Sequence, residues 1–389
     1  MPIADQMVGL VAASSMIREM FEEGLRMKRQ YGDRNVFDFS IGNPDVSPPR
    51  EFRQALRGLV NDDTLSHGYM PNTGYPHVRE AIAARMRDDH GLPLSSDHII
   101  MTVGAAGALN ISLKALMNPG EELLVPAPYF VGYDHYAFNA GVRVVTATTD
   151  EHFHLDLAAM EKAISHNTRV VLINSPHNPT GAVYGKEELA ALGDLLEVAS
   201  RKFGRRIYLI SDEPYNRIVY DTAVPSIFSV YPHTLLLTSF SKELSLAGER
   251  IGYLAIHPEA EDARAIVSAA GVVNTMLFVN APSLMQLAIA RIPGITVDIS
   301  LYRKRRDMLC KGLEAAGYEF DLPQGAFYLF PKSPIADDVA FARILKEEKI
   351  LVTPGVGFAG PGHFRISYAV PEWAIEGAMA GFGRAMDRA

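Results

Sequence analysis

A lysine, two serines and an arginine lie close together in one stretch of this 389-residue chain, Ser239-Phe-Ser-Lys242 followed by Gly248-Glu-Arg250-Ile-Gly252. A lysine amine is a nucleophile toward an aldehyde, with which it forms a Schiff base. Serine hydroxyls and a guanidinium are hydrogen-bond donors that suit a phosphate. The stretch therefore suits a cofactor with an aldehyde at one end and a phosphate at the other, although a polar loop around a solvated lysine has the same composition.

Other motifs resemble known sites but lack parts that those sites need. Ser239-x-x-Lys242 matches the S-x-x-K of penicillin-recognising serine hydrolases, yet their S-D-N and K-T-G motifs are missing. Gly355-x-Gly357-x-x-Gly360 matches a dinucleotide fingerprint, but we expect a strand after it rather than before it. The stretch from Gly181 to Lys186 is too short for a P-loop, and no H-E-x-x-H zinc motif occurs. We therefore predict none of these sites and no metal.

Short apolar runs alternate with helical patterns along the middle of the chain. Such alternation is typical of a largely parallel sheet covered by helices, in which buried strands read as continuous apolar segments. We expect strands at His98–Val103, Glu122–Val125, Val142–Thr146, Arg169–Asn174, Arg206–Ser211, Thr234–Thr238 and Ile251–Ala255.

The residues with unusual chemistry follow the ends of these strands. Right-handed crossovers place the carboxyl ends of parallel strands at one edge of the sheet, where loops bind ligands. We therefore expect the segments after the strands to lie near one another: Gly104–Gly107, Pro126–Tyr129, Ser175–Gly181, Asp212–Tyr215 and Ser239–Lys242.

The pattern changes beyond about Pro293, where a smaller α+β unit is expected. The predicted division is a large domain over residues 48–293 and a small domain built from residues 1–47 and 294–389. Outside the strands above, helices are expected at Ser14–Lys28, from about Glu51, at Val78–Asp89, Lys186–Phe203, Ile299–Ala315, Val339–Glu348 and from Pro371, and further strands at Phe37–Ile41 and Phe364–Tyr368.

Five motifs then occur in order at wide spacing: Asn178-Pro-Thr-Gly181, Asp212-x-x-Tyr215, Ser239-x-Ser-Lys242, Arg250, and Phe364-Arg365-Ile-Ser-Tyr368. Together they resemble the fold-type-I pyridoxal-phosphate enzymes, specifically the class I/II aminotransferases that include aspartate aminotransferase. The resemblance covers nearly the whole chain. It implies an α/β large domain with a mostly parallel seven-stranded sheet flanked by helices, a small α+β domain, and pyridoxal 5′-phosphate as cofactor.

The resemblance assigns roles at the reactive end of that cofactor. It implies that Lys242 holds the cofactor as an internal aldimine and then carries a proton between the substrate Cα and C4′ of the cofactor. Asp212 would face the pyridine nitrogen and keep it protonated. Asn178 and Tyr215 match the positions that hydrogen-bond the phenolic oxygen. Tyr129 falls where the family stacks an aromatic ring on the cofactor.

At the phosphate end, Arg250, Ser239 and Ser241 match the donors of the family. The backbone amides of Ala105 and Ala106 are expected to open a helix, and a helix N-terminus is a ready anion site.

Three further positions match family residues that bind the cofactor from a second subunit or bind the substrate. Tyr69 matches the tyrosine that reaches the phosphate from a second subunit, so the resemblance implies a homodimer with shared active sites. Arg365 matches the arginine that binds the substrate α-carboxylate, with Asn178 and the backbone of Gly42 beside it.

Composition excludes several classes of partner. The net charge of −8 and the absence of a basic run interleaved with aromatics argue against nucleic acid. The single cysteine, Cys310, fits a buried thiol and a reducing cytoplasm. Residues 265–290 carry no charge, but Asn274, Asn280 and Gln286 within them favour a buried or subunit-interface segment over a membrane span.

The sequence thus predicts a cytoplasmic aminotransferase that moves an amino group from an L-amino acid to a 2-oxo acid, by resemblance 2-oxoglutarate. A lyase of the same fold, such as a C–S β-lyase, would use the same cofactor groups and remains an alternative. A non-catalytic cofactor-binding regulator is disfavoured, because such proteins usually carry an added DNA-binding domain. No arginine stands in a motif for a second substrate carboxylate, so aspartate, alanine and aromatic donors all remain open.

Overall fold

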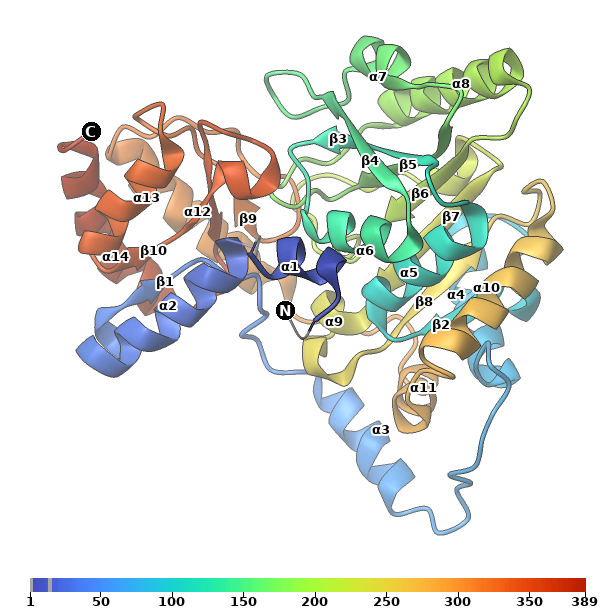
Figure 1. Cartoon of the computed structure of the whole chain (residues 1–389). Coiled ribbons are helices and arrows are strands. Elements are labelled where there is room, and N and C mark those ends of the chain that lie inside the picture. The colour runs from blue at the N-terminus through green and yellow to red at the C-terminus, as the bar shows by residue number, and fades with distance from the viewer. Residues whose placement is uncertain (1–2, 13–15) are drawn as a thin grey trace.

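A computed structural model describes residues 3–12 and 16–389 of the chain, and its secondary structure has a large sheet-containing part beside a smaller one (Figure 1). The strands are β1 (Phe37–Asp38), β2 (Ile99–Thr102), β3 (Glu122–Ala127), β4 (Arg143–Thr148), β5 (Thr168–Asn174), β6 (Tyr208–Asp212), β7 (Thr234–Ser239), β8 (Gly252–Ile256), β9 (Tyr328–Leu329), β10 (Ile350–Leu351), β11 (Thr353–Pro354) and β12 (Phe364–Ser367).

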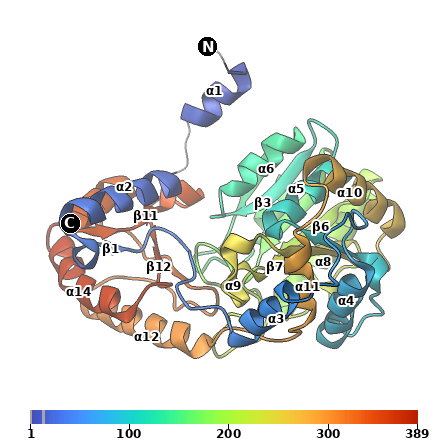
Figure 2. The same cartoon turned by 90° about the horizontal axis from the view of Figure 1, so that it is seen from below.

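The helices connect and cover these strands. They are α1 (Asp5–Ala12), α2 (Met16–Tyr31), α3 (Arg50–Val60), α4 (Pro76–His90), α5 (Gly104–Leu116), α6 (Gly132–Ala140), α7 (Leu157–Ala163), α8 (Lys186–Phe203), α9 (Phe240–Glu243), α10 (Ala263–Leu277), α11 (Ser283–Ala290), α12 (Ile299–Ala315), α13 (Asp338–Glu347) and α14 (Glu372–Met386). Helix α1 projects from the rest of the molecule (Figure 2).

The large sheet has seven strands in the order β2-β8-β7-β6-β5-β3-β4. Neighbouring strands from β7 to β4 run parallel, and β8 runs antiparallel to both β2 and β7. This confirms the predicted mostly parallel seven-stranded sheet. The reversed β8 means that the chain enters it, at Gly252, beside Ser239 at the carboxyl end of β7.

Alternate residues of each strand pack into two separate cores. Leu236 and Val171 belong to a core with α4 and α8, whereas Leu235 and Leu172 belong to another core with α5 and α6. Because both faces of the sheet are covered, the central strands β5 and β7 have apolar middle residues and are almost continuously buried.

The smaller part has a core of its own. Its three-stranded antiparallel sheet has the order β11-β12-β9, and the two-residue strand β1 pairs in parallel with β10. Side chains from both ends of the chain, such as Phe39, Leu309 and Phe382, are fully buried in this core. The division at residues 48–293 remains a prediction, which this packing supports.

Several boundaries differ from expectation. The strand expected at Phe37–Ile41 is limited to Phe37–Asp38, because its partner β10 supplies only two paired residues. The helix expected from Ser14 is described from Met16, and Ser14 itself lies outside the described residues. The uncharged stretch 265–290 is split between α10 and α11, and no helix in the described part of the chain is long and apolar enough to cross a membrane.

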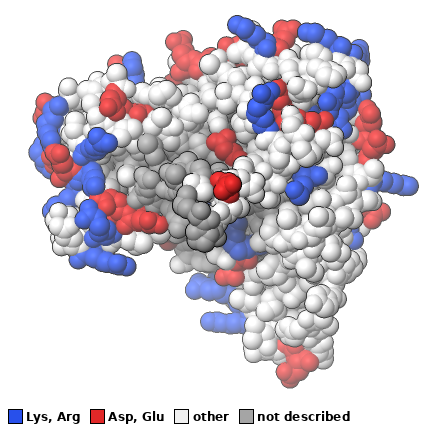
Figure 3. Space-filling view, in the orientation of Figure 1, with Lys and Arg blue, Asp and Glu red and all other residues white. Residues whose placement is uncertain are grey.

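Charged side chains of both signs are interspersed over the face of the molecule shown in Figure 3, which has no large field of blue. The described residues also form ion pairs near the surface, for example between Arg26 and Glu23 and between Lys304 and Glu372. This distribution agrees with the net charge of −8 in disfavouring a nucleic-acid surface on that face.

Candidate active site

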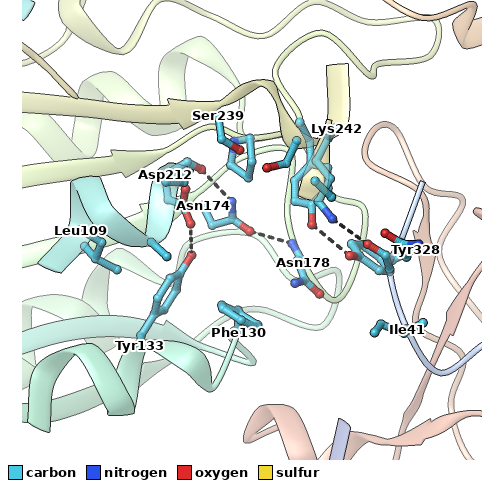
Figure 4. A pocket seen from close by; sticks show the side chains of 18 of the residues that line it. Ile41, Leu109, Phe130, Tyr133, Asn174, Asn178, Asp212, Ser239, Lys242 and Tyr328 are labelled. Carbon is cyan, nitrogen blue, oxygen red and sulfur yellow. Dashed lines mark hydrogen bonds between the residues drawn. The ribbon is translucent and has the colours of Figure 1, made fainter. Parts of the chain in front are cut away.

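A cavity of about 410 Å³ opens at the edge of the large sheet where β5, β6 and β7 end, and residues of the smaller part close its other side. Figure 4 shows Lys242, Asp212 and Asn178 pointing into it from neighbouring segments. It is lined by Ile41, Gly42, Asn43, Ala105, Ala106, Leu109, Phe130, Tyr133, Tyr136, Asn174, Asn178, Asp212, Pro214, Tyr215, Ser239, Ser241, Lys242, Ala247, Arg250, Tyr328 and Arg365.

Lys242 lies on the short helix α9, directly after β7. Its Nζ donates a hydrogen bond to the backbone oxygen of Gly42 at 2.6 Å, and the Phe327 ring lies 5.4 Å away. Burial, with the positive charges of Arg365 and Arg250 nearby, lowers the pKa of Lys242 to about 7. A large fraction of the amine is therefore neutral near pH 7 and able to act as a nucleophile.

Asp212 is the last residue of β6 and points into the cavity. Its Oδ2 accepts a hydrogen bond from the Tyr133 hydroxyl at 2.7 Å, while its Oδ1 is buried without a partner among the described residues. The backbone oxygen of Asp212 accepts a bond from Asn174 Nδ2 at 2.6 Å. Burial raises the pKa of Asp212 to about 7, and the Tyr133 hydrogen bond acts in the opposite direction. The carboxyl group thus offers one free, oriented oxygen to a cationic N–H group.

Arg365, on β12, is 2% exposed, and its guanidinium lies 4.5 Å from the ring centres of both Tyr328 and Phe358. Its Nη1 donates to Asn178 Oδ1 at 3.0 Å and its Nη2 to the backbone oxygen of Ser40 at 2.6 Å, leaving Nε unpaired among the described residues. No carboxylate in the described part of the chain pairs with it, and burial lowers its pKa. A buried, fixed cation without an anion is suited to a carboxylate ligand.

Tyr215 and Asn178 surround the space between Lys242 and Arg365. The hydroxyls of Tyr215 and Tyr328 lie 2.9 Å apart, and burial raises the pKa of Tyr215 well above its usual value. The backbone N–H of Asn178 donates to Asn174 Oδ1 at 2.8 Å, which fixes the loop after β5. These contacts fix two neutral hydrogen-bonding residues, Tyr215 and Asn178, in the lining of the cavity.

Gly42 approaches this group so closely that no other residue fits there without movement. A Cβ atom at Gly42 would lie 1.8 Å from the Tyr328 hydroxyl oxygen. The glycine therefore allows the backbone oxygen that accepts from Lys242 to sit beside the Tyr215–Tyr328 pair.

The opposite end of the cavity gathers groups that suit a phosphate. Helix α5 begins at Gly104, which has φ of +69° and would place a Cβ only 2.7 Å from Nη2 of Arg250. The amides of Ala105 and Ala106 belong to the first turn of that helix, and Ser239 and Ser241 line the same wall. Helix N-termini and guanidinium groups bind anions in concert.

One predicted aromatic contact is not where the sequence placed it. Tyr129 does not line the cavity, and its hydroxyl instead donates to Asp134 at 3.0 Å. Its neighbour Phe130 lines the cavity, so the aromatic wall is one residue further along the chain than expected. Tyr69 is also outside the cavity of its own chain and is 96% exposed.

Sequence reasoning missed Tyr133, Asn174 and Tyr328, which support the predicted residues. Asn174 is the last residue of β5, and Tyr328 ends the segment Gly325-Ala-Phe-Tyr328. For both residues, the place in the sequence was the one signal that could have indicated a role in the site. Tyr133 joins Asp212 across 79 positions of sequence, and that pairing depends on how α6 packs against the sheet.

The other motifs that the sequence analysis considered have structural roles and do not form functional sites. Cys310 is buried, and burial raises its pKa to about 12, so it is not a nucleophile. Residues Gly355–Phe358 form a short 3₁₀ turn between β11 and β12, without the strand-to-helix arrangement of a dinucleotide site. No cluster of metal-ligating side chains occurs within residues 3–12 and 16–389 as described.

The cavity therefore fits pyridoxal phosphate in its chemistry. Asp212 Oδ1, which has no partner among the described residues, is a buried acceptor for a ring N–H. Lys242 supplies an amine with a lowered pKa, and Gly104 leaves room for the Arg250 guanidinium at the anion end. All three groups line one cavity.

Comparisons with known proteins agree. The family described as "Aminotransferase class I and II" matches residues 34–381. The chain is 36% identical to the aspartate/prephenate aminotransferase of Thermus thermophilus, over 94% of each sequence, and 32% identical to a probable aspartate aminotransferase of Methanocaldococcus jannaschii, over 94% of this chain and 95% of that one.

Solved structures show the same likeness over whole chains. An amino transferase from Eubacterium rectale superposes with a TM-score of 0.96 at 40% identity, covering 100% of this chain and 99% of that one. The Thermus thermophilus aspartate aminotransferase with maleate superposes with a TM-score of 0.88 at 31% identity, covering 99% and 100%. The chain belongs to the class I and II aminotransferases, and it is a pyridoxal-phosphate-dependent enzyme of that family.

Proposed function

We propose that the enzyme moves an amino group from an L-amino acid to a 2-oxo acid, with 2-oxoglutarate as the acceptor, and that Lys242 is the amine that holds the cofactor. The observation that carries this proposal is the convergence of Lys242, Asp212 and Arg365 on one cavity. A nucleophilic amine, a ring-nitrogen partner and a carboxylate-binding cation are the three groups that the reaction needs.

Pyridoxal phosphate, when bound, supplies an electron sink that lets the Cα–H bond of an amino acid break. Lys242 acts as the proton carrier. Because the pKa of its amine is about 7, Lys242 is able to accept and release a proton near neutral pH, and it would carry the proton that leaves the substrate Cα. The Gly42 backbone oxygen, 2.6 Å from Nζ, orients the amine for this transfer.

Asp212 stabilises a protonated ring nitrogen through Oδ1. The bond from Asn174 to its backbone and the bond from Tyr133 to Oδ2 hold it in place. A carboxylate beside a ring N–H favours the charged form of the ring, which strengthens its electron-withdrawing character. Tyr215 and Asn178 are proposed to hydrogen-bond the phenolic oxygen from the other side.

Arg365 orients the substrate by its α-carboxylate. Its guanidinium is clamped between two aromatic rings and tied to Asn178 and Ser40, so its position is set before substrate arrives. A preorganised cation loses little entropy when it binds its ligand. By fixing the α-carboxylate, Arg365 is proposed to hold the substrate with its Cα–H bond toward Lys242. The backbone at Gly42 is proposed to approach the same carboxylate.

The basic side chains that line the cavity bear on which amino donor the enzyme uses. Lys242, Arg250 and Arg365 are the Lys and Arg side chains among the described residues that line the cavity, and each already has a proposed partner. The names of the relatives make aspartate the first donor to test. Its side-chain carboxylate would need a further cation, and no other Lys or Arg of the described residues lines this cavity.

We also propose that the enzyme is a homodimer in which Tyr69 of one subunit reaches the phosphate site of the other. Tyr69 is 96% exposed in the single chain, beside a surface cavity lined by residues such as Phe278 and Val279. An exposed aromatic next to exposed apolar residues is typical of a surface that another protein covers.

The test is the half-reaction of the loaded enzyme with single amino acids in the absence of a 2-oxo acid. An aminotransferase converts bound cofactor stoichiometrically to pyridoxamine phosphate and releases one 2-oxo acid per site. Given an S-substituted cysteine, a C–S β-lyase would instead break the Cβ–S bond, release a thiol, pyruvate and ammonia over many turnovers, and leave the cofactor in its aldehyde form. If no amino acid in a panel of aspartate, glutamate, alanine and the aromatic amino acids aminates the cofactor, the proposal is wrong.

A further inference from the structure

Tyr133 stands out among the residues of the cavity because its hydroxyl meets the carboxyl group of Asp212 directly. The O–H donates to Oδ2 at 2.7 Å, and the tyrosine is 2% exposed (Figure 4). In the part of the chain that the structure describes, Oδ1 of the same carboxyl group has no hydrogen-bond partner. One oxygen of Asp212 is thus occupied by Tyr133, and the other is left for a ligand.

The ring of Tyr133 is held so that this hydroxyl has little freedom. It stacks on Tyr129 with an interplanar angle of 5° and meets Phe130 edge-on, at centroid distances of 6.3 and 5.6 Å. Gly132, the first residue of α6, makes this packing possible, since a Cβ there would lie 2.3 Å from the Phe130 ring. The donor is therefore fixed by the fold before any ligand binds.

The surroundings of Asp212 explain why a single hydrogen bond from Tyr133 affects the protonation state of its carboxyl group. Burial favours the neutral acid, and the bond from Tyr133 opposes that effect. Tyr133 itself stays protonated, because burial beside Asp212 raises its pKa well above the ordinary value. The titratable and charged groups that face Asp212 or share its cavity are Tyr133 and Tyr136 from α6, Glu213 and Tyr215 after β6, and the cations Lys242, Arg250 and Arg365.

We propose that Tyr133 is a positioning residue, which holds Asp212 as a carboxylate and directs its Oδ1 to the ring nitrogen of the cofactor. This inference rests on the proposed function, in which Asp212 is the partner of that nitrogen. It adds a residue that acts through Asp212 rather than on the cofactor or substrate. The effect of the hydroxyl should therefore depend on pH, which a purely structural contribution would not.

The test is the substitution Tyr133→Phe, which removes the hydroxyl and keeps the ring packing. The apoenzyme is titrated with pyridoxamine phosphate from pH 6 to pH 9, with binding followed by fluorescence. This probe has no aldehyde, so its binding does not depend on a bond to Lys242. Losing the hydrogen bond should raise the pKa of Asp212 and move the acid limb of the affinity profile up by about one pH unit. With the pKa of Asp212 moving up from about 7 by one unit, affinity should fall about fivefold at pH 7, approach a tenfold loss toward pH 6 and return to the wild-type value near pH 9.

The matched control is Tyr231→Phe. Tyr231 is also 2% exposed and its hydroxyl also donates one buried bond, at 2.8 Å to the backbone oxygen of Ile207, away from the cavity. This variant should keep the wild-type profile at every pH. Thermal unfolding of both variants shows whether the loss of one buried hydroxyl has the same effect on stability at the two positions.

Two results would overturn the inference. The first is a wild-type affinity profile in Tyr133→Phe. The second is an affinity for the probe that is lowered equally at all pH values, because that would indicate a packing role alone. The double variant with Asp212→Asn separates this failure from failure of the proposed function. If Asp212→Asn alone binds the probe as tightly as wild type, then Asp212 is not the ring partner and both proposals fall. If Asp212→Asn weakens binding, adding Tyr133→Phe should have little further pH-dependent effect.

Discussion

At the scale of single residues, Arg365 gives the sharpest prediction about substrate binding. It is a buried cation with no anionic partner among the described residues, so replacing it should affect the substrate carboxylate and not the cofactor. Arg365→Leu should lower kcat/KM for an amino donor by about 100-fold or more, because a buried charged partner contributes several kcal/mol. Steady-state kinetics measure this, and the cofactor absorbance should be retained.

Arg365→Lys is the matched variant for that test. It keeps the charge but loses the planar fork that Asn178 and Ser40 orient, so its kcat/KM should lie between wild type and Arg365→Leu. An unchanged kcat/KM in Arg365→Leu would rule out the carboxylate-binding role.

The lowered pKa of Lys242 predicts a pH dependence for cofactor capture. A lysine with an ordinary pKa near 10.4 is almost wholly protonated at pH 7. Because the pKa of Lys242 is about 7, its amine is protonated below that pH and neutral above it. The rate at which apoenzyme reacts with pyridoxal phosphate should rise between pH 6 and 8 and then level off, as stopped-flow absorbance would show. A rate that continues to rise steeply up to pH 10 would contradict this.

The residues that sequence could predict are those that follow strands in a recognisable order. Lys242, Asp212 and Asn178 follow β7, β6 and β5 and line one cavity at the same edge of the sheet, as the alternation of strands and helices predicted. Tyr133 could not be found in this way, because its bond to Asp212 depends on the packing of an intervening helix. Tyr129 and Phe130 show that sequence could not predict which of two adjacent aromatic residues lines the cavity. The backbone conformation decides which side chain points into it.

At the scale of elements, the reversed strand β8 explains why Arg250 belongs to the site. Arg250 precedes β8, and only an antiparallel β8 starts at the edge where β7 ends. The apolar pattern predicted that a strand begins near Ile251, but a pattern of buried residues is the same in either direction. Long helices were easier: Lys186–Phe203 and Ile299–Ala315 have the predicted bounds, because their periodicity and terminal signals agree.

Gly104 gives a prediction at this scale, because it joins β2 to α5 beside Arg250. Gly104→Ala should place a methyl group 2.7 Å from Nη2 of Arg250 and displace the guanidinium. The affinity of the apoenzyme for pyridoxal phosphate should fall about tenfold or more, since a charge-assisted bond to phosphate is worth about 1.5–3 kcal/mol. Equilibrium titration of the apoenzyme measures it.

Gly91→Ala is the control for backbone strain. Gly91 has the same φ of +69°, yet nothing lies within 4 Å of the position of its Cβ. Both substitutions should lower the free energy of unfolding by about 1–2 kcal/mol, but only Gly104→Ala should weaken cofactor binding. Equal cofactor affinities in the two variants would show that Gly104 is not part of the anion site.

At the scale of the whole molecule, exposed apolar side chains gather near Tyr69 and along α10. Met276 is 68% exposed and Val272 is 61% exposed, on a segment that the sequence interpreted as buried or interfacial. A single chain leaves these side chains in water, and a symmetric dimer would cover them. The sequence could predict that the segment avoids charge but not which face of α10 is left uncovered.

Mixed dimers test this proposal. If Tyr69 completes the site of the other subunit, Tyr69→Ala and Lys242→Ala homodimers should each be nearly inactive. After mixing and exchange of subunits, heterodimers have one complete site each, so activity should recover to about a quarter of wild type. Activity that stays at the sum of the two parents would mean that Tyr69 acts within its own chain or not at all.

The most direct test of the central claim is to find which residue carries the cofactor. The loaded enzyme is reduced with borohydride, which fixes the cofactor to the amine that holds it, and the digested chain is analysed by mass spectrometry. The account predicts that the cofactor is attached to Lys242 and that Lys242→Ala loses both the attachment and transamination. Attachment to any other lysine, or full transamination by Lys242→Ala, would contradict it.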